Sequence, residues 1–195
     1  MDHDRSNKNP LVDEILATIA HAFGGEVEAE TSNVGLELTQ IVFRRNCPVK
    51  DVTSYSTVGL FEHKMFGPAG EFPVRIELAG ACENNVESFS KILASAACCI
   101  WATPGVFYPG AIILNRIQEF EPLAATEHLL LTTPFLWRGR LPTLELGAIK
   151  VSWLLAVPIS ESEYQYRRKC GAGSLEKLFE EVRLDIFDLK RKPIV

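Results

Sequence analysis

The stretch "LELGAIKVSWLLAVP" (144–158) constrains the fold of this chain more than any other part of its sequence. In an extended conformation its side chains alternate between two faces, and both faces are apolar. A strand that is apolar on both faces belongs in the middle of a sheet with further structure packed on each side. The segment therefore predicts a central strand over Leu144–Val157. One face is expected to carry Ile149, Val151, Trp153, Leu155 and Val157, and Leu154 and Ala156 help to cover the other.

Two short polar helices are expected to follow this strand directly. Pro158 ends the pairing of the strand, because proline has no N–H group to donate. Ser160 and Glu163 then form the Ser-x-x-Glu pattern of a capping box, which starts a helix. Gly171 can end that helix, and Ser174 is expected to begin the next one. The second helix is predicted to bury Leu175, Leu178, Phe179 and Val182.

Two longer helices are predicted earlier in the chain. Asn9 can cap the first, Pro10 suits its first turn, and a pair of glycines follows its last apolar residue. The second is expected to begin at Asn84 or Asn85 and to run to about Trp101, because its apolar residues recur every three or four positions.

Strands are expected where short runs rich in Val, Ile, Thr, Tyr or Phe are bounded by Gly, Pro or Asn. These runs are Leu36–Arg44, Val52–Phe61, Pro73–Ala79, Ala111–Phe120 and Glu127–Thr133. The segment "KMFGPAGEFP" (64–73) has the composition of a hairpin loop. Because no repeat or linker divides the chain, we predict a single α/β (α+β) domain over residues 1–195, with a mixed central sheet and helices packed on it.

Composition and charge argue against several classes of protein. Of the 195 residues, 47% are hydrophobic and 23% are charged, which is ordinary for a globular protein. The net charge of −5, without a basic stripe, argues against a nucleic-acid binder. No apolar run approaches the roughly 20 residues that cross a bilayer, and no secretory signal is apparent. The five cysteines are odd in number and irregularly spaced, so we expect no disulfide framework and a cytoplasmic location.

The sequence lacks the common motifs of catalytic, metal and cofactor sites. It has no Gly-rich phosphate or dinucleotide loop, no H-E-x-x-H and no C-x-x-C. Cys98 is the clearest nucleophile candidate, since Lys91 lies on the same side of the predicted helix, but nothing marks a base beside it. The four histidines stand far apart, without a metal-ligand spacing to Cys, Asp or Glu. We therefore predict no catalytic residue, no metal and no cofactor.

Glu77, in "VRIELAG", is the ionisable residue whose position best suggests chemistry. Val74, Ile76 and Leu78 share one face of the predicted strand, which leaves Glu77 on the other. If that second face is covered, the carboxylate needs a partner, because burying an unpaired charge is costly. The favoured interpretation is a structural carboxylate, either paired or exposed. The alternative is a catalytic acid that acts with a histidine or Cys98.

The segment "TTPFLWRGRLP" (132–142) is the best candidate for a protein-binding surface. Trp and Arg are over-represented at the energetic centres of protein interfaces. The predicted partner-interface residues are Phe135, Trp137, Arg138 and Arg140. A loop that simply folds its Trp into the core is the alternative, and the acidic face of the helices over 160–182 is the second candidate surface.

Several of these segments, taken together, resemble the Suppressor of fused domain family. They are "SYSTVGL" (54–60), "VRIELAG" (74–80), "LLTTPFLW" (130–137), "WLLAVPISESEYQYRRKCGAGSLEKLFEE" (153–181) and "DIFDLKRK" (185–192). The shared pattern is a T-x-G strand, an R-x-E-L strand, a strand ending in Pro-Ile-Ser, a Glu-Tyr helix and a Leu-rich helix. The resemblance covers most of residues 30–192, and the order of the motifs carries more weight than any one of them.

The resemblance implies an α/β domain like the N-terminal half of animal Suppressor of fused, which sequesters a transcription factor. The short form of this chain looks like the bacterial members of the family, which are commonly found beside polymorphic toxins and regarded as their immunity proteins. No catalytic residues are attributed to the family, and no binding residues can be carried over. The expected function is therefore a non-catalytic antitoxin-type protein that sequesters a cognate toxin in the cytoplasm. A small-molecule enzyme, and a regulatory domain that binds another protein or self-associates, are the alternatives.

Overall fold

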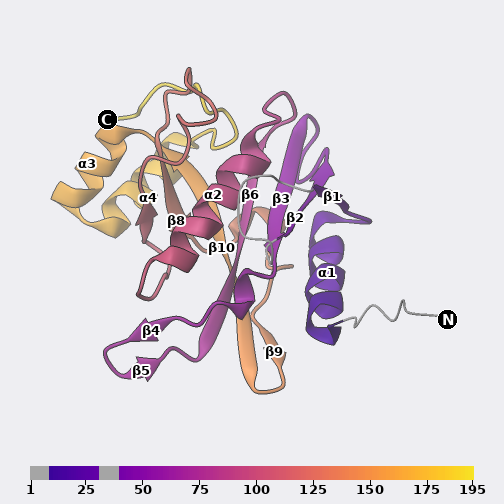
Figure 1. The fold of residues 1–195 in the computed structure, drawn as a ribbon. Coiled ribbons are helices and arrows are strands. Elements are labelled where there is room, and N and C mark those ends of the chain that lie inside the picture. The colour runs from indigo at the N-terminus through magenta and orange to yellow at the C-terminus, as the bar shows by residue number, and fades with distance from the viewer. Residues whose placement is uncertain (1–8, 31–39) are drawn as a thin grey trace.

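The computed structural model describes residues 9–30 and 40–195, which are built around one large sheet (Figure 1). Its strands run in the order β1-β2-β3-β6-β10-β8-β7, and β9 pairs with the first residues of β10. β6 and β10 are parallel, and the other neighbouring pairs described in this sheet are antiparallel. The strands are β1 (Glu28–Glu30), β2 (Gln40–Arg45), β3 (Val52–Val58), β6 (Val74–Glu83), β7 (Ile112–Ile113), β8 (His128–Thr132), β9 (Leu144–Leu146) and β10 (Ile149–Ile159).

β10 is the central strand that the sequence predicts. It lies between β6 and β8, and both Trp153 and Leu154 are almost completely buried. Trp153 packs into one core, whereas Leu154 and Ala156 pack into the core on the opposite face. The predicted strand begins too early, because the chain reverses at Gly147 and residues 144–146 form the separate strand β9. Gly147 has a φ of 65°, a left-handed conformation that glycine adopts without steric strain.

Two of the four described α-helices begin with the caps that the sequence predicts. The side chain of Asn9 accepts the N–H of Leu11, and Ser160 and Glu163 form the predicted capping box. The last helix begins at Ala172, two residues before the predicted Ser174. The helices are α1 (Pro10–Phe23), α2 (Phe89–Ala102), α3 (Glu161–Cys170) and α4 (Ala172–Val182).

α2 begins at Phe89, so the start predicted at Asn84 or Asn85 is wrong. The Asn84 side chain accepts a hydrogen bond from the Thr53 hydroxyl at 2.6 Å and donates one to Asn46 at 3.2 Å. Both contacts tie Asn84 to β3 and to the turn before it. The side chain is therefore occupied and does not cap the helix.

The expectation that Pro158 ends the pairing is wrong, because β10 pairs with β8 through Pro158 and Ile159. Two other predicted strands end earlier than the sequence suggests. The strand predicted over Val52–Phe61 stops at Val58, where Gly59, with a φ of 108°, turns the chain into the short 3-10 helix η1 (Leu60–Glu62). The strand predicted over Ala111–Phe120 is reduced to β7, and the rest of that run forms turns and coil. Both runs are apolar because they pack against the core, which does not require an extended backbone.

The remaining strand predictions are confirmed with small changes. β6 continues to Glu83, beyond the predicted end at Ala79. β2 overlaps the strand predicted over Leu36–Arg44 and ends one residue later, at Arg45, while residues 36–39 lie outside the described residues. The predicted hairpin is present, with β4 (Phe66–Gly67) antiparallel to β5 (Gly70–Glu71). No helix in the described part of the chain has the length and apolar character needed to cross a membrane.

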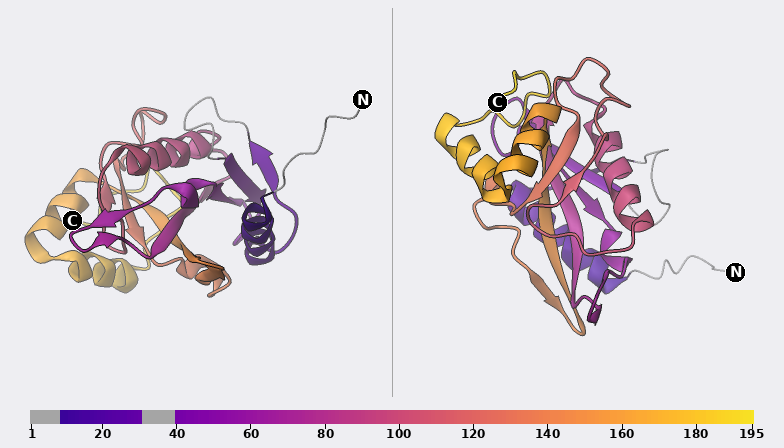
Figure 2. Two further views of the ribbon diagram at one scale, coloured as in Figure 1. Left: turned by 60° about the horizontal axis from the view of Figure 1, so that its bottom comes forward. Right: turned by 90° about the vertical axis from the view of Figure 1, so that its left-hand side faces the viewer.

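The helices cover the two faces of the sheet differently (Figures 1 and 2). On the front face, which is the face toward the viewer in Figure 1, α2 buries Phe89 and Ile100 completely. The rear face is covered by α1, by the segment between β8 and β9, and by α3 with α4. Ile15, Trp137 and Leu175, one residue from each of these pieces, belong to the same rear core.

Candidate functional site

Glu77 is completely buried and acts as a structural anchor. Its carboxylate accepts the N–H groups of Gly59 at 2.8 Å and Phe61 at 3.1 Å, and it also accepts the Thr57 hydroxyl. Burial raises the pKa of Glu77 to about 7, and these hydrogen bonds oppose that rise. All three partners lie where β3 turns into η1, so Glu77 holds this turn against β6. The favoured interpretation was a structural carboxylate, either paired or exposed, and the structure shows the buried, hydrogen-bonded form.

The residues of the enzyme hypothesis do not converge in the structure. Ile76 and Leu78 face α2, so the alternation along β6 directs Glu77 to the rear side of the strand. Cys98 lies on α2, at the front. Burial, together with the neighbouring Cys99, raises the pKa of the Cys98 thiol, which disfavours the nucleophilic thiolate. Among the described residues, the hydrogen-bond partners of Glu77 include no histidine and no cysteine.

His128 meets two carboxylates that the sequence spacing did not connect to it. One ligand atom each from Glu127, His128 and Glu161 lies within 4.8 Å of the others, with Glu161 supplied by α3. His128 Nδ1 accepts the backbone N–H of Asn115 at 3.0 Å, so its proton belongs on Nε2, which donates to Glu161 at 2.7 Å. A histidine that binds a metal through Nε2 carries its proton on Nδ1. The arrangement therefore fits a hydrogen bond between β8 and α3 rather than a metal site.

The predicted binding loop over 134–142 is anchored by its tryptophan and exposes its other candidate residues. The Trp137 side chain is only 3% exposed, its indole N–H donates to the Ser54 hydroxyl at 3.0 Å, and its ring lies 5.3 Å from that of Phe23. The side chains of Phe135, Arg138 and Arg140 are exposed, with Phe135 at 57%. Trp137 therefore holds the loop on the protein, and its neighbours are the residues that a partner can touch.

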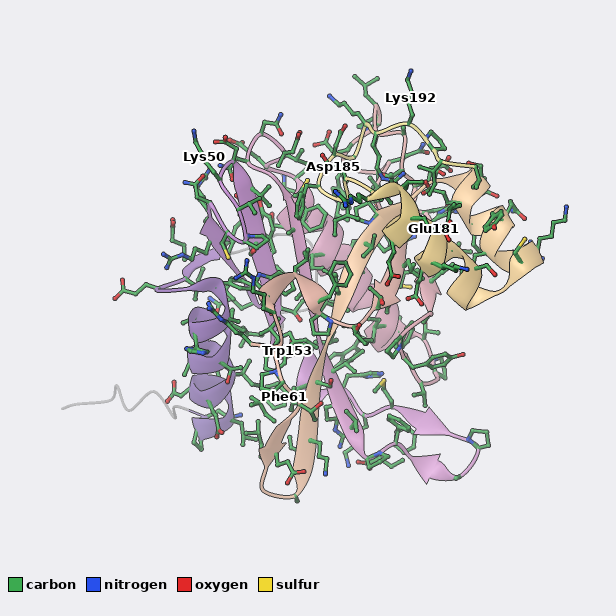
Figure 3. The ribbon with its side chains drawn as sticks, turned by 180° about the vertical axis from the view of Figure 1, so that it is seen from behind. Lys50, Phe61, Trp153, Glu181, Asp185 and Lys192 are labelled. Atoms are coloured by element: carbon green, nitrogen blue, oxygen red, sulfur yellow. The ribbon has the colours of Figure 1, made fainter. Side chains whose placement is uncertain are left out.

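A groove of about 510 Å³ lies between this loop and α4, on the rear face viewed in Figure 3. We call it the α4 groove. Its apolar part is formed by Leu130, Val157, Leu136, Phe179, Leu184 and Phe187. Glu176 and Glu180 of α4 line one side, and Phe135 lines the other. The structure thus brings the two candidate surfaces of the sequence, the loop and the acidic helix face, to opposite walls of one groove.

A second concavity, of about 430 Å³, lies on the other side of the loop, next to the end of α1. We call it the arginine groove, because Arg44, Arg138 and Arg140 line it. It shares Leu136 and Phe187 with the α4 groove, so the two are contiguous. Together they form a candidate surface on the rear face that combines apolar and charged side chains.

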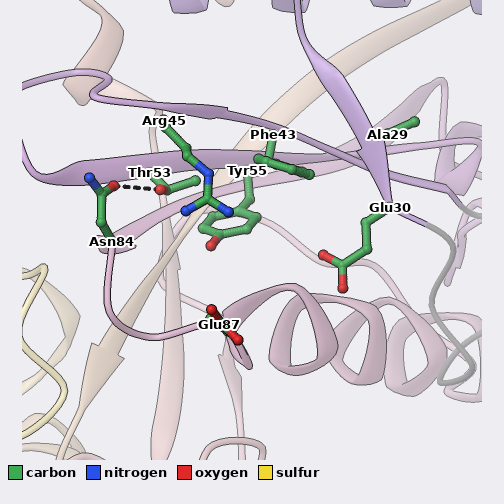
Figure 4. A pocket seen from close by; sticks show the side chains of 8 residues that line it. All are labelled: Ala29, Glu30, Phe43, Arg45, Thr53, Tyr55, Asn84 and Glu87. Carbon is green, nitrogen blue, oxygen red and sulfur yellow. Dashed lines mark hydrogen bonds between the residues drawn. The ribbon is translucent and has the colours of Figure 1, made fainter.

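A polar pocket of about 380 Å³ lies between the β1–β2–β3 edge of the sheet and the start of α2 (Figure 4). Figure 4 shows Arg45, Tyr55, Glu30 and Glu87 around it. Burial is the main cause that raises the pKa of Tyr55 to about 12, so the phenol keeps its proton and cannot act as a base at neutral pH. The pocket offers hydrogen-bonding groups without an activated nucleophile or base.

Comparison with known proteins identifies related chains over almost the whole length. A family model described as Suppressor of fused protein (SUFU) matches residues 33–192. The protein named "Immunity protein YqcF" from Bacillus subtilis (strain 168) is 32% identical over 186 residues, which cover 93% of this chain and 95% of that protein.

Solved structures share the fold. A SUFU homologue from Neisseria gonorrhoeae FA 1090 superposes with a TM-score of 0.72 at 16% identity, covering 94% of this chain and 96% of the homologue. Drosophila Suppressor of Fused superposes with a TM-score of 0.67 at 12% identity, covering 91% of this chain and 49% of the fly protein. This chain therefore matches about half of the fly protein.

The loop was predicted from the sequence, but the residues that surround it were not. Arg44 lies on β2, and Phe187 lies in the C-terminal segment, yet both line the grooves beside Arg138. No local pattern connects residues so far apart in the chain. The short "DIFDLKRK" motif was the one signal at hand, because its apolar residues had no assigned place in a helix or strand.

Proposed function

This chain belongs to the Suppressor of fused family, and we propose that it is a non-catalytic immunity protein that binds and occludes a cognate toxin in the cytoplasm. The observation that carries this proposal is the 32% identity with a protein named as an immunity protein, over 93% of this chain and 95% of the relative. Identity that extends over both whole chains favours a shared function more than a match to one segment does.

The chemistry of the ionisable residues supports a protein without catalysis. Glu77 is used to hold a turn, and His128 is used to join β8 to α3. The raised pKa of the Cys98 thiol, caused mainly by burial, disfavours the nucleophilic thiolate. An immunity protein needs only a surface complementary to its toxin, and the two contiguous grooves beside the 134–142 loop supply a candidate surface.

The proposal predicts that a toxin domain is encoded beside this chain, and that domain, once purified, is the test partner. Wild-type protein is expected to bind that domain and to inhibit its activity at stoichiometric amounts, as measured by calorimetry and by a toxicity assay in cells. Phe135→Ala is expected to weaken binding by at least about 10-fold, since it removes an exposed aromatic from the rim of the α4 groove.

Phe66→Ala is the matched control. Phe66 is 54% exposed, close to the 57% of Phe135, but it lies on the β4–β5 hairpin. It is expected to bind the toxin as tightly as wild type. Absence of binding by the wild-type protein would contradict the proposed function, whereas equal effects of the two substitutions would move the binding surface elsewhere.

A further inference from the structure

The arginine groove carries positive charge that no carboxylate in the described part of the chain neutralises through a salt bridge. Arg44, Arg138 and Arg140 line it, and no Asp or Glu is among its lining residues. Within residues 9–30 and 40–195, none of the three arginines takes part in a salt bridge. The chain as a whole has a net charge of −5. The positive concavity is therefore a local feature that overall composition does not explain.

The loop that carries two of these arginines is held by its own backbone. The N–H of Arg138 donates to the Phe135 carbonyl at 3.2 Å, and the N–H of Arg140 donates to the Trp137 carbonyl at 3.0 Å. The buried indole of Trp137 fixes this turn to Ser54 of β3. A loop positioned before binding loses less conformational entropy when a partner arrives.

The third arginine is seated against the turn that follows α1. Arg44 Nη1 donates to the Glu26 carbonyl at 3.2 Å. Gly25 makes this position possible, because a Cβ on Gly25 would lie only 2.0 Å from Arg44 Nη1. The Arg44 guanidinium is thus held beside the groove by a hydrogen bond. It occupies space that a side chain at position 25 would otherwise fill.

The two contiguous grooves form one surface. It is basic in the arginine groove, apolar where the grooves meet, and acidic in the α4 groove. Leu136 and Phe187 form the part that both grooves share. Beyond them, the far wall carries Glu176, Glu180 and Arg183, which together are negative. Glu176 is oriented by the Thr132 hydroxyl, which donates to it at 2.9 Å. A partner that fits the whole surface must present the complementary order of groups.

We propose that the toxin segment bound here places an Asp or Glu carboxylate against Arg138 and Arg140 and an apolar side chain in the α4 groove. This inference rests on the proposed function and specifies the chemistry of its contact. Guanidinium groups bind carboxylates through two parallel hydrogen bonds, which gives both strength and orientation. The neighbouring apolar floor lowers the exposure of that pair to water and strengthens it.

A nucleic acid would fit this surface less well than a protein segment. Its phosphates repeat along the strand, and those that pass the arginines would next meet Glu176 and Glu180. Like charges placed together at an interface strongly disfavour binding. A protein segment can place one carboxylate at the arginines and then continue with apolar or basic residues.

The first test reverses the charge of the groove. Arg138→Glu with Arg140→Glu is expected to weaken binding of the purified toxin domain by at least about 100-fold. The matched control, Lys91→Glu with Lys192→Glu, makes the same change in net charge at exposed positions that line neither groove. The control pair is expected to bind within about 3-fold of wild type, because charges outside the contact act only through a screened field.

The second test identifies the carboxylate directly. The variant with Arg138→Lys and Arg140→Lys keeps the positive charge and supplies amines that a carbodiimide can couple to a carboxylate in contact. The carbodiimide activates the carboxylate, the lysine Nζ attacks its carbon, and an amide forms as the urea leaves. Mass spectrometry is expected to find a lysine introduced at position 138 or 140 joined to an Asp or Glu of the toxin, with no such link at the native Lys91.

The outcomes separate this inference from the proposed function. If wild type binds the toxin but the charge-reversed variant binds equally well, the function stands and the carboxylate contact is wrong. If wild type binds no toxin, both fall together. If a single-stranded RNA oligonucleotide binds wild type tightly and the charge reversal abolishes that binding, the groove binds phosphate groups. The inference is then overturned.

Discussion

The front and rear faces of the sheet show two ways of covering a β-sheet. At the front, the single helix α2 lies close to the strands. Gly80 of β6 allows this approach, because a Cβ there would lie 2.7 Å from the ring of Phe89. The contacts at this face are mostly apolar, and Ile113 of β7 and Ile117 complete the same front core.

The rear face is covered by separate pieces that polar contacts join together. Trp137 and Trp153 donate their indole N–H groups to the Ser54 and Ser56 hydroxyls of β3 at 3.0 and 3.1 Å. Glu163, at the start of α3, is bound by the C-terminal segment. Pieces joined in this way leave grooves between them. The comparison teaches that a cover assembled from separate pieces leaves aromatic and basic side chains exposed beside its grooves, as Phe135, Arg138 and Arg140 are on the rear face.

The largest effect is expected at the front face, from Phe89→Ala. This change removes a fully buried ring at the point where α2 touches β6, and it is expected to lower the free energy of unfolding by about 4 kcal/mol. Urea denaturation measures the loss. Toxin binding should be unchanged wherever the variant is still folded, because the ring lies on the opposite side of the sheet from the grooves. A loss of affinity in folded protein would show that the faces are coupled.

Arg191→Ala is expected to destabilise the cover of the rear face by a different mechanism. Arg191 makes two parallel contacts with Glu163, of 2.6 and 2.8 Å, and also donates to the Pro158 carbonyl at 3.0 Å. Its loss leaves a buried carboxylate without its cation, which costs about 3 kcal/mol of unfolding free energy. Lys192→Ala, at the exposed neighbouring position, is the control and should have almost no effect. An equally mild result for both variants would mean that Glu163 finds another cation.

Two buried carboxylates, Glu77 and Glu163, are expected to respond to pH in opposite directions. Glu77 has a pKa raised from 4.5 to about 7, chiefly by burial, so the folded state holds this proton more tightly than the unfolded state. Its contribution to stability is therefore present at low pH and lost as the pH rises from about 4.5 to about 7. For Glu163, burial alone would raise the pKa, but Arg191 and backbone N–H groups hold it below its ordinary value. Its contribution is present above that value and lost as the pH falls.

Glu77→Gln separates these two effects. Between pH 5 and 7.5, the Glu77 carboxylate alone is expected to remove about 2 kcal/mol of unfolding free energy from the wild-type protein. The Glu77→Gln variant should lack this decline while keeping the acid-side loss from Glu163. Urea denaturation of both proteins across this range checks the difference. Parallel curves would show that Glu77 keeps an ordinary pKa in the folded state.

The smallest expected effect comes from Ser54→Ala, which removes a hydrogen bond that anchors the 134–142 loop. The hydroxyl accepts the Trp137 indole N–H and donates to the Cys47 carbonyl at 2.7 Å. Removing it leaves both buried groups without this partner and is expected to cost between about 1 and 2 kcal/mol. Toxin affinity should fall a few-fold, since the loop is less well positioned. Thr18→Ala, which removes an exposed hydroxyl on α1, serves as the control for both measurements.

The predictions that succeeded rest on patterns within one segment. The caps at Asn9 and Ser160 use side chains and N–H groups two or three residues apart, and alternation along β10 reports burial on both of its faces. Predictions failed for two different reasons. Asn84 bonds Thr53 across the sheet instead of capping α2, so a distant residue took the capping side chain. Gly147 reverses the chain within one apolar run, which becomes two paired strands.

The candidate site divides in the same way. Phe135, Arg138 and Arg140 were identified from the residue types favoured at interfaces, and the structure exposes all three. Trp137 was predicted on the same grounds, but its side chain lies in the rear core. Residue type alone does not distinguish an aromatic that anchors a loop from one that contacts a partner, because both roles favour a large apolar ring with a polar atom.

The sequence by itself determined the central strand and the helix that follows it, α3. It also determined the absence of common catalytic motifs and the family resemblance. Each depends on neighbours along the chain or on the order of motifs, which a linear sequence records. Only the tertiary structure decided that Glu77 stabilises the turn after β3 and that Trp137 anchors the 134–142 loop. It also decided that Arg44, Arg138 and Arg140 line one groove. These roles depend on contacts between segments that come together when the apolar faces of the sheet are buried. Packing, and not spacing along the chain, sets which residues meet.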